Sequence, residues 1–432
     1  MNKLYNSTNY IIYALAFVLV FFSTISRMWY KTGFYYDIGK FFHTGFMHRA
    51  FFSPFELIIL LLLINIILNY QFNFKFSHGL VIFAFITYFF RMLNPNADPS
   101  NPVLGMPLFS NLGEYLLIFL LVVFLSLPSS LFLKIAEKLF VATVSLSIVR
   151  IFFLLIMFFS GQAQMIRWGS YAVIIDEPDT QLLFAFIGAI CYALYLLSSR
   201  KKYLLASVLI LGVTFLSGQR STALPGLIAV FLISLFVFLK RLPTLAARSA
   251  LIITIMFALL SVVVIQLPES KVSFAINRFI GATIQKQDAD RVEFSDTGHR
   301  EQSVQVFQSI LSEKPFWGLG YGRSDEMYLE GQTSDIHNAY AGIWLRHDII
   351  TLLFYLFLVV VLIKESYSLL SLTTQRNFQT YLVSILASFY LFGYFFAIWF
   401  MPDTFLATFR MQLFYFMIIL FVVHSNKVIH HT

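Results

Sequence analysis

Charged residues are scarce in this chain of 432 residues. They make up 12% of it, and hydrophobic residues make up 59%, whereas an ordinary soluble domain carries about 25% charged and about 45–50% apolar residues. This balance excludes an ordinary water-soluble domain and indicates a membrane protein. Cysteine is scarcer still, because Cys191 is the single one. The sequence therefore excludes an intrachain disulfide.

Motifs for metals, nucleotides and one class of hydrolase are missing as well. There is no HExxH and no His/Cys ligand spacing, so a zinc site is not supported. The Gly-x-Ser-x-Gly elbow of many hydrolases is also absent. The glycine-rich segment 318–324 has no strand before it, so it predicts a tight turn, or a backbone that approaches a sugar closely, rather than a dinucleotide site. We expect no metal, no cofactor and no nucleic-acid partner.

Long apolar runs, in contrast, are abundant. A helix that crosses a bilayer needs about 20 apolar residues, or somewhat fewer where the bilayer is thin. We therefore expect an all-α, polytopic membrane protein of about 12 transmembrane helices, the first of them an uncleaved span rather than a signal peptide. The twelve runs lie near 10–28, 52–70, 78–93, 114–133, 139–160, 182–199, 203–217, 222–239, 249–266, 349–364, 379–400 and 405–424.

One long hydrophilic stretch interrupts these runs and predicts three parts. Residues 1–266 would form a bundle of nine spans, residues 267–348 a loop outside the membrane, and residues 349–432 a bundle of three spans. Within the loop, apolar residues at helical spacing predict amphipathic helices at 271–284 and 296–315. Any chemistry outside the membrane would be carried by this loop.

The positions of Lys and Arg in the short loops predict the orientation. With the N-terminus in the cytoplasm, the "RKK" at 200–202 and the pair Lys240–Arg241 lie inside, directly beside spans. The outer side still holds a basic excess, which suggests an anionic ligand or lipid headgroups there. The alternative, an inverted orientation, fits the "RKK" and "KR" segments less well.

Three arginines are candidates for binding an anion. Arg220 lies between two apolar runs at the outer edge, and we interpret it as functional ahead of a snorkelling arginine. Arg150 lies inside an apolar run, where an arginine costs roughly 2.5–3.5 kcal/mol, and this predicts an acidic or anionic partner, or else a structural partner near 176–179. Arg300 would lie in the first turn of the 296–315 helix, beside unpaired N–H groups.

The segment that leads into the run at 349 carries His337 and Asn338. A histidine acts as a general base near neutral pH, and a nearby carboxylate such as that of Asp335 would raise its basicity. The alternative is a polar surface histidine in a loop.

The order of these segments is more specific than each one alone. "SGQRSTALPGLIAVFLISL", then "GHREQSVQVFQSILSEKPFWGLGYG" and then "HNAYAGIWLRHDIIT" together resemble the O-antigen polymerase and O-antigen ligase superfamily over roughly residues 205–365. The resemblance implies a protein of the bacterial inner membrane that transfers glycan from an undecaprenyl-diphosphate carrier at the periplasmic face, without metal or nucleotide. It also implies catalytic roles for Arg220, Arg300 and His337.

The same resemblance suggests further binding residues and partners. The partners would be the undecaprenyl-diphosphate-linked glycan donor, a glycan acceptor and membrane lipids, with a chain-length regulator as a further candidate. The residues that would bind the diphosphate or the glycan are Arg150, Gln219, Arg323, Asn338 and Arg346.

The subtype is less clear than the superfamily. Asp348 stands where the ligase pattern has glycine, so we favour a polymerase of O-antigen or another surface polysaccharide over a ligase that moves polymer onto the lipid A core. A polysaccharide flippase or transporter is an alternative of another class. It would predict repeat symmetry and broken helices in matching halves, whereas this chain concentrates its polar residues in one outer segment.

Overall fold

The computed structural model is built almost wholly of helices. It describes residues 2–17, 20, 54–69, 129–159, 167–168, 171–172, 178–216, 220–266, 307–309, 311–313, 315–318, 338–346, 348–372 and 374–397. Apart from turns, these residues are helical except for one pair of two-residue strands, β1 (Arg167–Trp168) and β2 (Tyr171–Ala172), which are antiparallel. The predicted all-α class is confirmed at this level.

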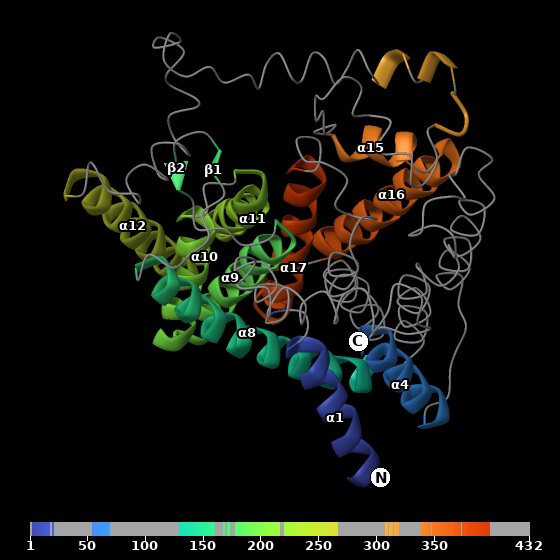
Figure 1. Ribbon diagram of the computed structural model, residues 1–432. Helices are drawn as coiled ribbons and strands as arrows, with labels where there is room; N and C mark the ends of the chain where they lie inside the picture. Colours follow the sequence, from blue (N-terminus) through green and yellow to red (C-terminus); the bar gives the residue numbers. More distant parts are fainter. Residues whose placement is uncertain are drawn as a thin grey trace.

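The longer helices follow the predicted apolar runs, and Figure 1 shows their arrangement. They are α1 (Asn2–Phe17), α4 (Pro54–Asn69), α8 (Ser129–Phe159), α9 (Pro178–Ser198), α10 (Lys201–Leu216), α11 (Arg220–Leu239), α12 (Pro243–Gln266), α16 (Ile349–Leu372) and α17 (Gln375–Ala397). The short helix α15 (Ala339–Arg346) lies within the predicted loop 267–348, where no apolar run was predicted.

Several of these helices have the length and composition of membrane spans. Among the described residues, three segments are long and apolar enough to cross a bilayer, namely Ile135–Ile156, Ile349–Leu372 and Asn377–Ala397. Shorter apolar helices cover Leu57–Leu68, Leu182–Ser198, Ala223–Leu239 and Pro243–Met256. The apolar helices indicate a membrane protein. The total of about twelve spans and the boundaries of the three predicted parts stay predictions.

Helix α8 differs from the sequence-based expectation of a break between the runs at 114–133 and 139–160. It is continuous from Ser129 to Phe159. The residues between the two runs, "KIAEK" at 134–138, are mostly good helix formers, so nothing in them ends a helix. The ammonium group of Lys138 donates a hydrogen bond to Asn9 Oδ1 at 2.8 Å, which ties this polar part of α8 to α1.

Helices α9, α11 and α17 pack together at the centre of the fold (Figure 1). Glycines bring them close, because a methyl group placed on Gly226 of α11 would lie 3.0 Å from the carbonyl oxygen of Ala185 of α9. A methyl group on Gly393 of α17 would lie 3.1 Å from the backbone of Pro225 of α11. Close approach through small residues is the usual way helices gain van der Waals contact in a bilayer.

The short turns between helices define two ends of this bundle. We call one the basic end: it holds the turn from Ser198 to Lys201 and the turn from Leu239 to Pro243. The opposite end, which we call the Arg220 end, holds the starts of α9 and α11.

Helix α17 runs from the basic end to the Arg220 end. The ring of Phe378, near its start, lies 5.1 Å from that of Phe236 near the end of α11. Further along, the hydroxyl of Tyr390 donates a hydrogen bond to the carbonyl of Leu182 near the start of α9, at 2.7 Å.

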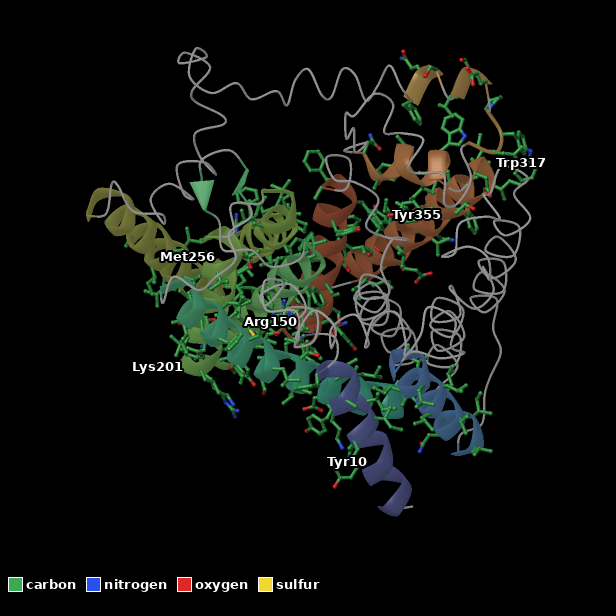
Figure 2. The ribbon with its side chains drawn as sticks, viewed as in Figure 1. Tyr10, Arg150, Lys201, Met256, Trp317 and Tyr355 are labelled. Atoms are coloured by element: carbon green, nitrogen blue, oxygen red, sulfur yellow. The ribbon has the colours of Figure 1, made fainter. Side chains whose placement is uncertain are left out.

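Positive charge is concentrated at the basic end. Arg200, Lys201, Lys202 and Arg241 are exposed there, and Figure 2 shows Lys201 at the lower left, far from Trp317 and Tyr355. The guanidinium of Arg248 donates hydrogen bonds to the carbonyls of Leu196 and Leu197 at the end of α9, where a cation also offsets the negative end of the helix dipole. Cytoplasmic loops carry this kind of basic excess.

Candidate functional site

Arg220 is the first residue of α11. Its backbone is described, whereas its side chain and the neighbouring Gln219 lie outside the described residues. At the first turn of a helix, backbone N–H groups lack intrahelical partners and the helix dipole is positive. An anion near this turn would therefore meet both the arginine and the start of the helix.

Asn338 begins α15. Its Oδ1 accepts a hydrogen bond from the N–H of Ala341 at 3.1 Å, and its carbonyl accepts one from the N–H of Gly342 at 2.9 Å. This is the geometry of an N-cap, a position at which asparagine is among the preferred residues. The cap fixes the start of α15 at Asn338. The preceding residue in the chain, His337, lies outside the described residues.

The starts of α11 and α15 lie at the same end of the bundle, and the end of α17 joins them (Figure 1). The hydroxyl of Tyr340, in the first turn of α15, donates a hydrogen bond to the carbonyl of Phe395 at 3.1 Å. Gly393, two residues earlier on α17, lies against Pro225 in the early part of α11. Two segments predicted to carry the site, far apart in sequence, are thus brought together through α17.

Part of the predicted loop is docked on α15. Residues 307–309 and 311–313, within the predicted amphipathic helix 296–315, are helical. The ring of Phe307 packs edge-on against that of Trp344, with centroids 5.9 Å apart. The indole N–H of Trp344 donates a hydrogen bond to the carbonyl of Pro315 at 2.9 Å.

The turn Pro315–Gly318 continues this contact to the start of α16. The N–H of Ile349 donates a hydrogen bond to the carbonyl of Phe316 at 3.2 Å. Gly318 has φ 58°, a left-handed conformation that glycine adopts readily. The tight turn predicted for the glycine-rich segment 318–324 therefore has its first residue in the expected conformation.

The corner between α15 and α16 holds buried polar groups. Asp348 is 0% exposed, and one of its carboxylate oxygens accepts a hydrogen bond from the N–H of Thr351 at 2.6 Å, which caps α16. Within the part of the chain that the structure describes, the other oxygen of Asp348 and the hydroxyl of Thr351 have no hydrogen-bond partner. The rings of Tyr340 on α15 and Tyr355 on α16 pack against each other, with centroids 5.8 Å apart.

The hydroxyl of Tyr340 is a neutral donor in this environment. Burial raises its pKa from 10.0 to about 12, because the ionised form would lose its hydration. Its hydrogen bond to Phe395 therefore persists across the physiological pH range.

Arg150 is buried in α8, with 1% of its surface exposed (Figure 2). Its guanidinium donates a hydrogen bond to the carbonyl of Val20 and lies 5.5 Å from the ring centroid of Phe184 on α9. These contacts connect α8 to the chain after α1 and to α9. The sequence left open an acidic or anionic partner and a structural partner near 176–179, and these contacts show a structural partner elsewhere, the backbone carbonyl of Val20. A role of Arg150 in binding diphosphate stays a prediction.

The remaining candidates are placed only in part. Arg346 is the last residue of α15, but its side chain lies outside the described residues. Arg300, Arg323 and His337 lie wholly outside them. Among the residues that are described, no three His, Cys, Asp or Glu side chains are grouped as a metal site would require.

Asp348 was not among the residues predicted from the sequence to form the site, where it appeared only as a departure from glycine. A signal was available in the sequence: an aspartate directly before an apolar run is typical of a residue that caps the start of a helix.

A comparison with protein-family models matches part of the chain. No curated protein matches the chain. A family model described as O-antigen ligase matches residues 186–356, a range that runs from α9 into α16 and includes Arg220, Asn338 and Asp348. Over these residues the match supports the resemblance, found in the sequence, to the superfamily of O-antigen ligases and polymerases.

Proposed function

We propose that the protein is a polymerase of O-antigen or a related surface polysaccharide. It transfers an oligosaccharide repeat from undecaprenyl diphosphate to a sugar hydroxyl of an acceptor, at the periplasmic face of the inner membrane. One observation carries this proposal: the starts of α11 and α15, which bear Arg220 and Asn338, both pack against the end of α17. Both helix starts lie within the range matched by the O-antigen ligase family model.

The charge distribution supports the sidedness of this proposal. Exposed Lys and Arg side chains gather at the basic end, which by the positive-inside rule faces the cytoplasm. The Arg220 end then faces the periplasm. A lipid-linked donor would present its diphosphate at the membrane edge there, beside the first turn of α11, where helix N–H groups favour an anion.

The reaction requires one bond to form and one to break. The oxygen of the acceptor hydroxyl attacks the anomeric carbon of the donor sugar, and the bond from that carbon to the diphosphate oxygen breaks. The diphosphate takes the electron pair, and His337 takes the proton of the attacking hydroxyl.

Negative charge grows on the leaving diphosphate as the bond breaks. Arg220 and Arg300 would stabilise it as preorganised donors, with Arg323 and Arg346 as further candidates. Removal of a single donor of this kind from an oxyanion site costs about 2.7–4 kcal/mol. The rate should therefore fall about 10²- to 10³-fold for each arginine replaced.

Alanine substitutions test these roles. Arg220→Ala, Arg300→Ala and His337→Ala should each abolish the polymer ladder in cells and in a reaction of the purified chain with lipid-linked repeat. The protein should still reach the membrane. Lys202→Ala, at the exposed basic end, is the matched control and should leave the ladder normal. Normal ladders in all three test variants would contradict the mechanism.

A ligase that transfers finished polymer onto the lipid A core is the second candidate, because the matching family model is described as O-antigen ligase. The two functions leave different products in a strain that lacks the gene. A lipid A core bearing a single repeat indicates that a polymerase was lost. Polymer that accumulates on the carrier indicates that a ligase was lost.

A further inference from the structure

The corner at which α16 begins carries a carboxylate that capping alone does not explain. Asp348 caps α16 with one oxygen, which accepts the N–H of Thr351. Serine, threonine or asparagine would cap a helix about as well, without burying a negative charge. The second oxygen of Asp348 is buried and has no partner among the described residues. A group in this state is costly unless a ligand supplies its hydrogen bond.

The hydroxyl of Thr351 is available beside it. Elsewhere in this chain buried threonines bond the carbonyl four residues earlier: Thr143 donates to Leu139 at 2.6 Å and Thr214 to Ile210 at 2.8 Å. Thr351 lies in the first turn of α16, so no carbonyl of its own helix lies four residues before it. Thr351 is 4% exposed. Its hydroxyl is buried and has no hydrogen-bond partner within the described part of the chain.

We propose that Asp348 and Thr351 together bind one hydroxyl group of the acceptor glycan. A sugar hydroxyl donates one hydrogen bond and accepts others. A carboxylate oxygen only accepts, and a threonine hydroxyl can donate. The two free groups therefore complement a single sugar hydroxyl. This inference rests on the proposed function and adds a glycan subsite to it.

The position of the pair favours the glycan over the diphosphate. A carboxylate repels a diphosphate, so Asp348 belongs on the side of the site away from the leaving group. The helix α15, with 8 residues, spans about 12 Å and connects Asn338, next to the proposed base His337, to the corner at Asp348. An oligosaccharide acceptor whose attacking hydroxyl lies beside His337 can reach across this length.

The turn Pro315–Gly318 lies against the corner. Two hydrogen bonds hold it there, from Trp344 to the carbonyl of Pro315 and from Ile349 to the carbonyl of Phe316. Because Asp348 and Thr351 are buried, binding of the acceptor requires that a segment beside them, such as this turn, moves aside.

Three substitutions separate glycan binding from capping. Asp348→Asn keeps an oxygen for the cap and replaces the second oxygen by an NH₂ group, which cannot accept a hydrogen bond. Thr351→Val keeps the shape of the side chain and removes the hydroxyl. Ser366→Ala is the matched control, because the hydroxyl of Ser366 is also buried without a partner among the described residues, but lies much further along α16.

The experiment measures turnover of the full purified chain with donor and acceptor concentrations varied separately. Asp348→Asn should raise KM for the acceptor about tenfold or more, and Thr351→Val severalfold, as expected for lost hydrogen bonds to a charged and a neutral group. KM for the donor and the melting temperature should stay near wild type. An unchanged acceptor KM in Asp348→Asn, or a loss of thermal stability that accounts for the loss of rate, would overturn the inference.

A binding measurement keeps this test separate from the proposed function. The probe is the repeat oligosaccharide released from its carrier, titrated into the purified wild-type and Asp348→Asn proteins. Weaker binding to the variant supports the subsite, and equal binding overturns it, whether or not the wild type extends polymer. Polymer formation by the wild type is the independent test of the proposed reaction.

Discussion

Gly393 on α17 offers the sharpest test of how the site is assembled. A methyl group at this position would lie 3.0 Å from Ile228 Cβ and 3.1 Å from both the Cα and the carbonyl oxygen of Pro225. The Pro225 atoms belong to the backbone of α11 and cannot rotate away. Gly393→Ala should therefore push α17 away from α11 by a few tenths of an ångström. Phe395, two residues further on, holds Tyr340 of α15, so the displacement should reach Asn338.

The magnitude follows from two opposing terms. Alanine in a helix interior is favoured over glycine by about 0.5–1 kcal/mol. Inserting a methyl group into a well-packed contact costs about 1–3 kcal/mol. The expected net loss for Gly393→Ala is about 1 kcal/mol. Gly212 on α10 is the matched control, because a methyl group there would meet nothing within 4 Å, and Gly212→Ala should gain about 0.5–1 kcal/mol.

The assay compares the two glycine variants with wild type in detergent. Thermal unfolding should place Gly212→Ala at or above wild type and Gly393→Ala below it. Glycan transfer, measured well below the melting temperature, should fall only in Gly393→Ala, because only that change displaces the start of α15. If both variants unfold and turn over like wild type, the contact between α11 and α17 does not position the site.

Two further substitutions test single contacts. Tyr340→Phe removes the hydrogen bond to Phe395 and should lower the free energy of unfolding by about 1 kcal/mol. Because burial raises the pKa of Tyr340 in the folded protein from 10.0 to about 12, this difference should be constant below pH 10 and disappear as pH rises towards 12. Arg150→Lys keeps the charge but loses the planar guanidinium that contacts Val20 and Phe184. It should lower the free energy of unfolding by about 1–3 kcal/mol. A melting temperature equal to wild type would show that these contacts contribute little.

The apolar runs predicted helices where the structure has them, because long apolar sequence leaves few other structures in a membrane. The start of α16 at Ile349 coincides with the predicted run at 349. The continuity of α8 was not predicted, since a short polar segment was interpreted as a loop although its residues favour helix. Composition alone does not distinguish a polar turn from a polar stretch of helix that another helix covers, as α1 covers Lys138.

The candidate site was predictable as a set of segments but not as a set of contacts. Asn338 was chosen for its place beside His337, and its capping role follows from local sequence preference. The partners of Arg150 could not be predicted, because Val20 and Phe184 are distant in the chain and a carbonyl acceptor has no sequence signature. Nor does the sequence indicate that α17 lies between the starts of α11 and α15, because that depends on the close approach allowed by Gly393.

The placement of α17 has a consequence for the synthesis of the protein. Helix α17 follows the region matched by the family model, which ends at residue 356, and the ribosome makes it after α11 and α15. Domains and segments made first fold first during translation, but here the two halves of the site have their shared neighbour only after α17 has entered the membrane. A nascent chain that stops short of α17 would carry the matched region and still be unable to assemble the site, so we expect activity to begin only after α17 has been made.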